Sequence, residues 1–266
     1  MQNGFTMPAV FACLLLLAPA VRGAEPVPLV NAHAHNDYEH PRPLLDALDH
    51  GFGSVEADVW LVGGELLVAH NRVSVRTGRT LQKLYLDPLR ARVQAGGGRV
   101  FPGGPSLTLL IDVKSDATNT WLALRDVLRG YESMFTRFRG DTTETNAITV
   151  IISGNRAREA MKADTNRLAA YDGRLEDLAT GASASLIPLV SDNWNRISQW
   201  SGKAPLPPAD ESKLRDAVAR AHAQGRRIRF WGAPDTPAVW TVFRAAGVDL
   251  LNADDLPGLK EFLLRP

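Results

Sequence analysis

Short runs of apolar residues alternate with longer amphipathic segments along most of the chain. The runs are rich in Val, Ile, Leu and Ala and predict buried strands at residues 26–32, 54–60, 66–69, 107–111, 147–152, 167–171, 185–190, 227–231 and 248–252. Apolar residues spaced three or four apart predict helices at residues 44–48, 81–89, 155–163, 214–221, 238–246 and 256–264. The clearest helical repeat joins Leu124, Leu128, Tyr131, Phe135 and Phe138.

This order of about eight strands in alternation with helices is typical of a (β/α)₈ barrel. A chain of 266 residues is long enough for one such barrel, so we expect a single domain, with a doubly wound sheet as the alternative. Catalytic residues of barrels lie at the carboxyl ends of the strands. The residues at or just after predicted strand ends are His35, Asp58, Asp112, Trp231 and Asn252.

The first residues differ from the rest of the chain. Residues 7–21 contain no charged side chain, and the small residues Ala18, Ala20 and Gly23 suit a cleavage site. The apolar run is too short to span a bilayer. We therefore expect residues 1–23 to be a cleaved signal peptide and residues 24–266 to form a secreted or periplasmic domain. A retained anchor or a later start codon is the alternative.

Composition places the chain among soluble globular proteins, with 45% hydrophobic and 22% charged residues. The only cysteine, Cys13, lies within the predicted signal peptide, so the mature domain is expected to have no disulfide. Without residues 1–23, which contain Arg22 and no acidic residue, the formal net charge changes from +1 to 0. This balance predicts no nucleic-acid partner, and we expect no stable insertion into a membrane.

Three acidic residues lie within or directly after predicted strands. Glu56 and Asp58 are two residues apart on one strand, so their side chains share a face. Asp112 ends the next predicted barrel strand. Three convergent carboxylates without cysteine suit a hard cation such as Mg²⁺ or Ca²⁺ and suit Zn²⁺ poorly. Solvated charges at strand ends are the alternative, which the apolar residues flanking the carboxylates disfavour.

Two imidazoles, those of His35 and His70, also follow predicted strands. A strict two-residue turn at residues 63–64 would pair Ala57 with His70 and place His70 on the face opposite the carboxylates. We therefore expect a bulge or longer loop between Trp60 and Leu66, which the two glycines of the turn readily permit.

Four segments around these residues resemble the glycerophosphodiester phosphodiesterase and phosphatidylinositol phospholipase C superfamily, and within it the altered-inheritance-of-mitochondria branch. They are HAHNDY, SVEADVWL, LLVAHN and LLIDVK. RIRFWGAPDTPAVW and GVDLLNADDLPGLKEF resemble the last two barrel strands of that superfamily. The resemblance implies a phosphodiesterase barrel with these roles: His35 and His70 as the acid–base pair, Glu56, Asp58 and Asp112 as metal ligands, and Lys114 facing the phosphate.

One departure from the family pattern concerns the phosphate-binding arginine. The usual His-Arg-Gly of the phosphodiesterases is His35-Asn36-Asp37 in this chain, so the arginine is absent and the standard glycerophosphodiester substrate is in question. We expect Asn36 to occupy the position of the family arginine in the substrate site. Arg42 and Arg229 are the candidates to compensate. Trp231 is expected to line the substrate pocket, with buried packing as the alternative.

The residues together suit cleavage of a small-molecule or lipid phosphodiester. One imidazole accepts a proton from the attacking hydroxyl, the other donates to the leaving oxygen, and a divalent cation offsets the growing charge. A non-catalytic barrel that binds phosphate or sugar phosphate is one alternative, supported by the missing arginine. A metal-dependent amidohydrolase is another, suggested by His33-Ala34-His35 but disfavoured because only His222 follows His70.

Overall fold

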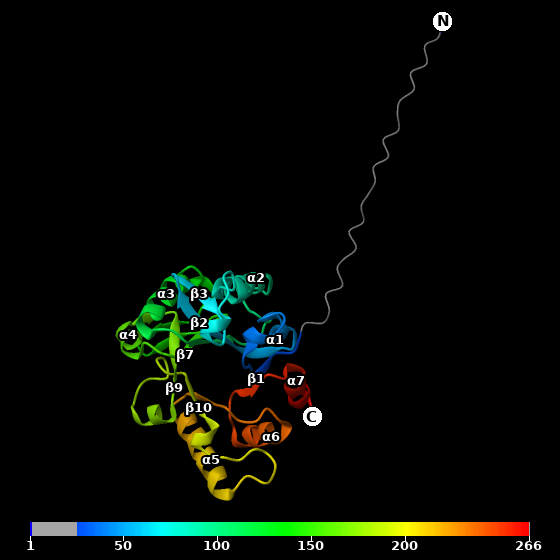
Figure 1. Cartoon of the computed structure of the whole chain (residues 1–266), viewed down its shortest axis with the longest axis vertical. Helices are drawn as coiled ribbons and strands as arrows, with labels where there is room; N and C mark the ends of the chain where they lie inside the picture. Colours follow the sequence, from blue (N-terminus) through cyan, green and yellow to red (C-terminus); the bar gives the residue numbers. More distant parts are fainter. Residues whose placement is uncertain (2–25, 266) are drawn as a thin grey trace.

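The computed structural model describes Met1 and residues 26–265 (Figure 1). The rest of the predicted signal peptide, including Cys13, lies outside the described residues. Within them, eight parallel strands form a nearly closed barrel, so the (β/α)₈ prediction is confirmed and the doubly wound alternative is wrong. In order around the barrel, the strands are β11 (Arg227–Trp231), β10 (Leu189–Asn193), β9 (Ala169–Gly173), β7 (Ile148–Gly154), β4 (Leu107–Val113), β2 (Phe52–Val62), β1 (Leu29–Ala34) and β12 (Leu251–Ala253).

The two ends of this sheet approach each other between β11 and β12. A single parallel bridge joins Arg229 to Leu250, the residue before β12. The barrel interior contains a small apolar cluster of Leu110, Ile151, Leu189 and Leu250, while the larger apolar core lies between the strands and the helices. Along β4, Leu110 shares a face with Asp112, because side chains alternate along a strand. The carboxylate of Asp112 therefore belongs to the inner face of the barrel.

The helices lie on the outside of the barrel (Figure 1). They are α1 (Leu45–Asp49), α2 (Asp87–Ala95), α3 (Ala117–Arg129), α4 (Arg158–Ala163), α5 (Pro208–Ala223), α6 (Pro237–Ala246) and α7 (Leu256–Leu264), with a π-helical turn at Gln82–Leu86 before α2. The last helix, α7, packs beside the first strand, β1 (Figure 1). Among the described residues, no helix is both long and apolar enough to cross a bilayer.

The helix predicted from Leu124 to Phe138 ends earlier than its apolar spacing indicated. It begins after Asp116, whose Oδ1 accepts a hydrogen bond from the backbone N–H of Asn119 at 2.9 Å. It ends before Gly130, and Phe138 instead lies in a short strand, β5 (Arg137–Arg139). Phe138 is buried in that strand, as it would be on the apolar face of a longer helix. The spacing of apolar residues fits both structures, and for this reason it predicted too long a helix.

A second, three-stranded sheet stands beside the barrel, and its first two strands were not predicted. The order of strands in this sheet is β6 (Thr142–Glu144), β5 and β8 (Asn166–Arg167). The region between β9 and β10 also differs from a regular barrel repeat, because it contains only a short 3-10 helix at Leu175–Ala179. The strand predicted at residues 185–190 begins later, at Leu189.

The β2–β3 hairpin contradicts the predicted irregularity between Trp60 and Leu66. Strand β3 (Glu65–Val68) pairs with β2 in an unbroken register, with Val62 opposite Glu65 and Val59 opposite Val68. The two glycines of the turn have φ values of +60° and +84°, which a two-residue hairpin turn requires. His70 still reaches the carboxylate side, because the strand ends at Val68 and the alternation of faces no longer applies beyond it.

Candidate active site

A cavity of about 270 Å³ lies at the carboxyl ends of the barrel strands. It brings together all but one of the residues that the sequence singled out for the site. Its lining consists of His35, Asn36, Glu56, Asp58, His70, Asp112, Lys114, Ser153, Arg174, Arg229 and Trp231. The exception is Arg42.

The three carboxylates of Glu56, Asp58 and Asp112 form one cluster. Strand pairing places Asp58 of β2 beside Asp112 of β4, and each of the three residues offers an oxygen within 4.8 Å of the others. Atoms Oδ1 of Asp58 and Asp112 are buried and have no hydrogen-bond partner among the described residues. Close carboxylates with unpartnered oxygens fit the oxygen ligands of a divalent cation. The cluster can therefore hold a metal ion of the Mg²⁺ or Ca²⁺ type.

Electrostatics within the cluster favour a positive partner. Burial, with the nearby charge of Glu56, raises the pKa of Asp58 to about 7, and burial also raises the pKa of Asp112. The ammonium of Lys114 lies 3.1 Å from Asp58 Oδ2 and 3.2 Å from Asp112 Oδ2. Burial acts to raise the pKa of Glu56 too, but the adjacent His33 and the charge of Arg229 hold it well below its usual range.

A carboxylate from the far end of the chain positions His35. Its Nδ1 lies 3.0 Å from Oδ1 of Asp254, and the side-chain amide of Asn36 donates to the same oxygen at 3.2 Å. The other ring nitrogen, Nε2, lies 4.0 Å from Glu56 Oε2. Burial acts to lower the pKa of His35, but the Asp254 hydrogen bond and the charge of Glu56 outweigh it and raise the pKa above its ordinary value. The Asn36 side-chain nitrogen also lies 2.9 Å from Nδ1. The carboxylate beside Nδ1 and the raised pKa suit His35 to acid–base chemistry.

Tyr38 links His70 to the acidic cluster. Its hydroxyl lies 2.7 Å from Asp58 Oδ2, 2.7 Å from Asn36 Oδ1 and 2.9 Å from His70 Nδ1. The hydroxyl has one proton to donate, and both Asp58 and Asn36 offer only acceptor oxygens to it. A proton on His70 Nδ1 therefore has two acceptors, the tyrosine oxygen and Asp58 Oδ2, which lies 3.3 Å away. This arrangement leaves His70 Nε2 free for proton transfer.

The first histidine of the His33-Ala34-His35 motif contacts one member of the carboxylate cluster, with its Nε2 3.3 Å from Glu56 Oε2, but it does not line the cavity. His33 is fully buried, Arg229 donates to its Nε2, and its Nδ1 lies 2.7 Å from the hydroxyl oxygen of Ser54. Burial lowers the pKa of His33 to about 4, so the ring is neutral near pH 7. His222 bonds Asp249 at 2.9 Å on the outside of the barrel. These positions give no support to the metal-dependent amidohydrolase alternative.

The two arginines expected to compensate for the family arginine lie in different places. Arg229 lines the cavity and has its Nη1 3.6 Å from Glu56 Oε2. Arg42 lies outside the lining, where it donates from Nε to Asp46 at 2.7 Å and from Nη2 to Asp49 at 2.8 Å on an exposed surface. That position does not fit the compensating role that we expected for Arg42.

Four residues that the sequence analysis did not assign also belong to this site: Tyr38, Ser153, Arg174 and Asp254. Arg174 directly follows β9, so the rule that barrel sites lie at strand ends could have found it. Asp254 likewise follows the last strand, β12. Tyr38 lies in the HAHNDY segment, and the sequence offered only pocket lining or buried packing for it; it is buried outside the cavity lining, and its bonds to Asp58 and His70 depend on segments that meet only in the fold.

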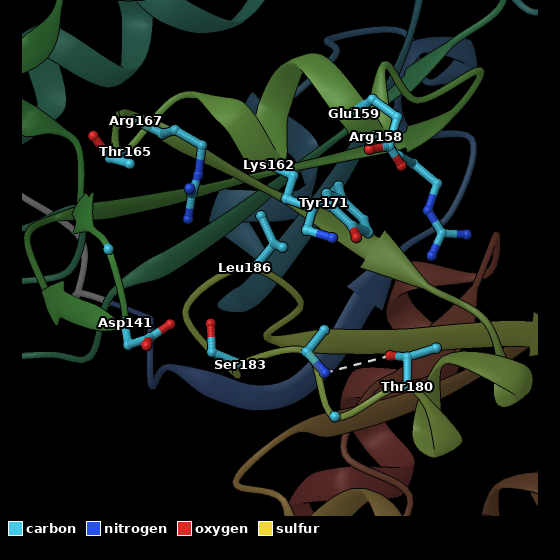
Figure 2. A pocket seen from close by; sticks show the side chains of 13 residues that line it. Asp141, Arg158, Glu159, Lys162, Thr165, Arg167, Tyr171, Thr180, Ser183 and Leu186 are labelled. Carbon is cyan, nitrogen blue, oxygen red and sulfur yellow. Dashed lines mark hydrogen bonds between the residues drawn. The ribbon is translucent and has the colours of Figure 1, made fainter.

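A larger cavity of about 490 Å³ opens on the flank of the barrel (Figure 2). Its lining mixes cationic Arg158 and Lys162 with anionic Asp141 and Glu159, and it contains no imidazole. Figure 2 shows these charged groups spread around the opening rather than converging on one point. The chemistry of the side chains, rather than the volume, therefore makes the smaller cavity the candidate active site.

A nearly closed (β/α)₈ barrel with acidic and imidazole groups at the strand ends is compatible with the phosphodiesterase-like class of barrels. The sequence model of the AIM6-like phosphodiesterase domain matches residues 21–172, and that of the glycerophosphoryl diester phosphodiesterase family matches residues 227–257. The chain belongs to the AIM6-like phosphodiesterase domain family, within the glycerophosphodiester phosphodiesterase superfamily, so the predicted family is confirmed.

Individual relatives agree with this placement. Altered inheritance of mitochondria protein 6 of Eremothecium gossypii is 32% identical over 88% of this chain and 69% of its own length. A homolog of that protein from Arthroderma benhamiae is 29% identical over 91% of this chain and 85% of its own length. The crystal structure of a glycerophosphodiester phosphodiesterase from Parabacteroides distasonis has a TM-score of 0.53 at 15% identity, covering 88% of this chain and 96% of that one. At this identity the structural likeness shows the shared fold.

Proposed function

We propose that this protein is a metal-dependent phosphoric diester hydrolase whose substrate resembles a glycerophosphodiester or a phospholipid headgroup. One observation carries the proposal: two imidazoles with ordered partners and three close carboxylates line a single cavity. Membership of a phosphodiesterase domain family supports the reaction class. The substrate is a small-molecule or lipid phosphodiester.

The carboxylates of Glu56, Asp58 and Asp112 hold the divalent cation in this proposal. A bound cation of this type offsets the negative charge that grows on the phosphoryl oxygens. Lys114 and Arg229 add fixed positive charge on two sides of the same cluster. These cations limit the repulsion between the carboxylates and hold them in place for the metal.

The two histidines divide the proton transfers. His35 is the general base, because Asp254 holds its Nδ1 proton and raises its basicity, so that Nε2 can accept the proton of the attacking hydroxyl. His70 is the general acid and donates to the leaving oxygen from Nε2. Its position at the open side of the cavity, with the side chain 59% exposed, allows it to regain a proton from solvent.

A hydroxyl of the substrate itself is the proposed nucleophile. Ser153 is the one serine or threonine of the cavity lining, and its hydroxyl donates to Asp172 at 2.9 Å rather than to an imidazole. A covalent enzyme intermediate is therefore disfavoured. An oriented hydroxyl beside the phosphate has a large effective concentration, which favours a cyclic phosphate as the first product.

The protein acts outside the cytoplasm in this proposal, after cleavage of residues 1–23. N-terminal sequencing of secreted or periplasmic protein should then begin near Ala24. Recovery from the cytoplasm alone, with Met1 or Met7 at the N-terminus, would refute this location.

Turnover of glycerophosphocholine, which carries a free hydroxyl beside the phosphate and an alkoxide leaving group, tests the proposed reaction with and without Mg²⁺ or Ca²⁺. We expect cation-dependent release of choline, and losses of about 10²–10⁴-fold for His35→Ala and for His70→Ala. His50→Ala is the matched control, because His50 bonds the backbone of α1 and lies outside the cavity lining. Binding of glycerol 3-phosphate without turnover of any diester would instead support a non-catalytic binding barrel, which the absence of the family arginine favours.

A further inference from the structure

Arg174 lies on the side of the candidate active site opposite His35. It follows β9, which is four positions from β1 in the order of the eight barrel strands and therefore lies across the barrel from it. Its backbone N–H donates to Asp177 Oδ2 at 2.8 Å, and the same carboxylate pairs with Arg158. These contacts anchor the start of the Arg174 side chain at the rim of the cavity.

The guanidinium of Arg174 is held through a single nitrogen. Its Nη1 donates to Asp172 Oδ2 at 3.0 Å, to the carbonyl of Gly173 at 2.8 Å and to the carbonyl of Ser191 at 3.3 Å. Asp172 is fully buried and also accepts from Ser153, so this partner is itself ordered. Across residues 26–265, no hydrogen-bond partner is found for Nε or Nη2 of Arg174. The edge of the guanidinium that carries these two nitrogens is therefore free.

The other two cations of the cavity lining are already committed to the acidic cluster. Lys114 pairs with Asp58 and Asp112, and Arg229 lies next to Glu56. Arg174 differs because its ion-pair partner, Asp172, is outside the cluster. It is therefore the lining cation whose charge is available to an anionic ligand without removing a partner from the carboxylates.

We propose that Arg174 binds the phosphate of the substrate through Nε and Nη2, and so takes over the function of the family arginine that Asn36 replaces. The proposal rests on the proposed function in one respect, that the cavity accepts a phosphodiester. A guanidinium edge presents two parallel N–H donors that match two phosphate oxygens, which an ammonium group cannot do. Asp172 is a positioning residue that fixes the plane of this edge.

Calorimetric titration of the mature chain with glycerol 3-phosphate, in buffer containing Mg²⁺, tests the proposal without requiring turnover. We expect Arg174→Met to weaken binding by about 10- to 100-fold, the usual effect of losing charged hydrogen bonds. Arg174→Lys should recover only part of the affinity, because the charge remains but the two-donor edge is lost. Arg196→Met is the matched control, since Arg196 is an exposed arginine near Glu176 and outside the cavity lining.

The outcomes separate this proposal from the proposed reaction. If the wild type binds glycerol 3-phosphate but cleaves no diester, the hydrolase proposal fails, and the affinity of the Arg174 variants alone decides the role of Arg174. Equal affinities of wild type, Arg174→Met and Arg196→Met would overturn that role, as would the absence of any binding by the wild type. If Arg174→Met does not fold, as judged by circular dichroism, wild-type affinity in Arg174→Lys would equally overturn the two-donor role.

Discussion

The hydroxyl of Tyr38 lies 2.9 Å from Nδ1 of His70, although the two residues are 32 positions apart in the chain. Tyr38 is 2% exposed, whereas the side chain of His70 is 59% exposed. A buried hydroxyl group therefore orients an imidazole that lies beyond the end of its strand. Because the same hydroxyl bonds Asp58, the orientation of His70 is tied to that of the acidic cluster.

Tyr38→Phe should lower kcat by about tenfold or more, since the imidazole of His70 loses its orienting partner while the aromatic ring still fills its buried space. KM should change little, because the ring does not line the cavity. Steady-state kinetics with glycerophosphocholine, whose leaving group needs a proton, measures both. Tyr131→Phe, which removes an exposed hydroxyl bonded to Asp87 at 2.8 Å, is the control. An unchanged kcat in Tyr38→Phe would show that Tyr38 does not position His70 for catalysis.

Gly154→Ala should abolish metal-dependent activity by displacing Asp112. Gly154 has a φ of +64°, and an added Cβ would lie 2.0 Å from Asp112 Oδ1. Gly140→Ala is a matched control, because Gly140 has a φ of +56° but no atom within 4 Å of an added Cβ. Both variants carry the strain of a positive φ at a residue other than glycine, but the added Cβ of Gly154→Ala would also lie 2.5 Å from the carbonyl oxygen of Val113, next to Asp112. Only Gly154→Ala should therefore weaken Mg²⁺ affinity in a calorimetric titration. Full activity of the wild type after treatment with a chelator would contradict the metal site itself.

Asp37 should make the stability of the fold depend on pH. Burial raises the pKa of its carboxyl to about 7, while the tyrosine hydroxyl of Tyr85 and the backbone N–H of Leu44 both donate to Oδ2 and Oδ1 has no partner. The folded state therefore favours the protonated carboxyl. Its stabilising contribution is complete below the unfolded pKa, near 4, and is lost as the pH rises through about 7.

Asp37→Asn replaces this carboxyl by a group that resembles its protonated form at every pH. Between about pH 5 and pH 8, the wild type should lose on the order of 2 to 3 kcal/mol of unfolding free energy relative to the variant. Urea unfolding of both proteins at the two pH values measures this difference. A parallel change in both proteins would show that Asp37 does not titrate in this range.

Diesters with a free hydroxyl beside the phosphate should be cleaved on the order of 10²-fold faster than deoxy analogues, because an oriented neighbouring hydroxyl attacks far more effectively than water. Phosphorus NMR should show a cyclic phosphate as a transient or final species. Equal rates on both substrates, with ¹⁸O from solvent incorporated in the first step, would leave activated water as the nucleophile.

Most of the barrel and the central part of the candidate site followed from local sequence pattern. A spacing of two on a strand places Glu56 and Asp58 on one face whatever the rest of the chain does. The alternation of strands and helices predicts a barrel, and the barrel brings Asp112 to the same end of the sheet. These conclusions needed no knowledge of contacts between distant residues.

Periodicity was misleading where two structures satisfy the same pattern. Phe138 continues the apolar spacing of α3, yet it lies in β5 of the second sheet and is buried there. The face of His70 was inferred from strand alternation, yet the strand ends two residues earlier, at Val68. In both cases the environment of the side chain was predicted correctly: Phe138 is buried and His70 lies at the candidate site. The backbone conformation that places each side chain there was predicted wrongly.

The sequence by itself therefore determined the class of fold, the shared face of two carboxylates and the strand ends that carry His35 and Asp112. Only the tertiary structure decided which groups orient them. Asp254 lies 219 residues from the imidazole of His35 that it bonds, and Arg174 reaches the cavity because β9 closes the far side of the barrel. Local pattern reports the conformation and burial of a segment, whereas the partners of a buried polar group depend on which strands the closed sheet brings together.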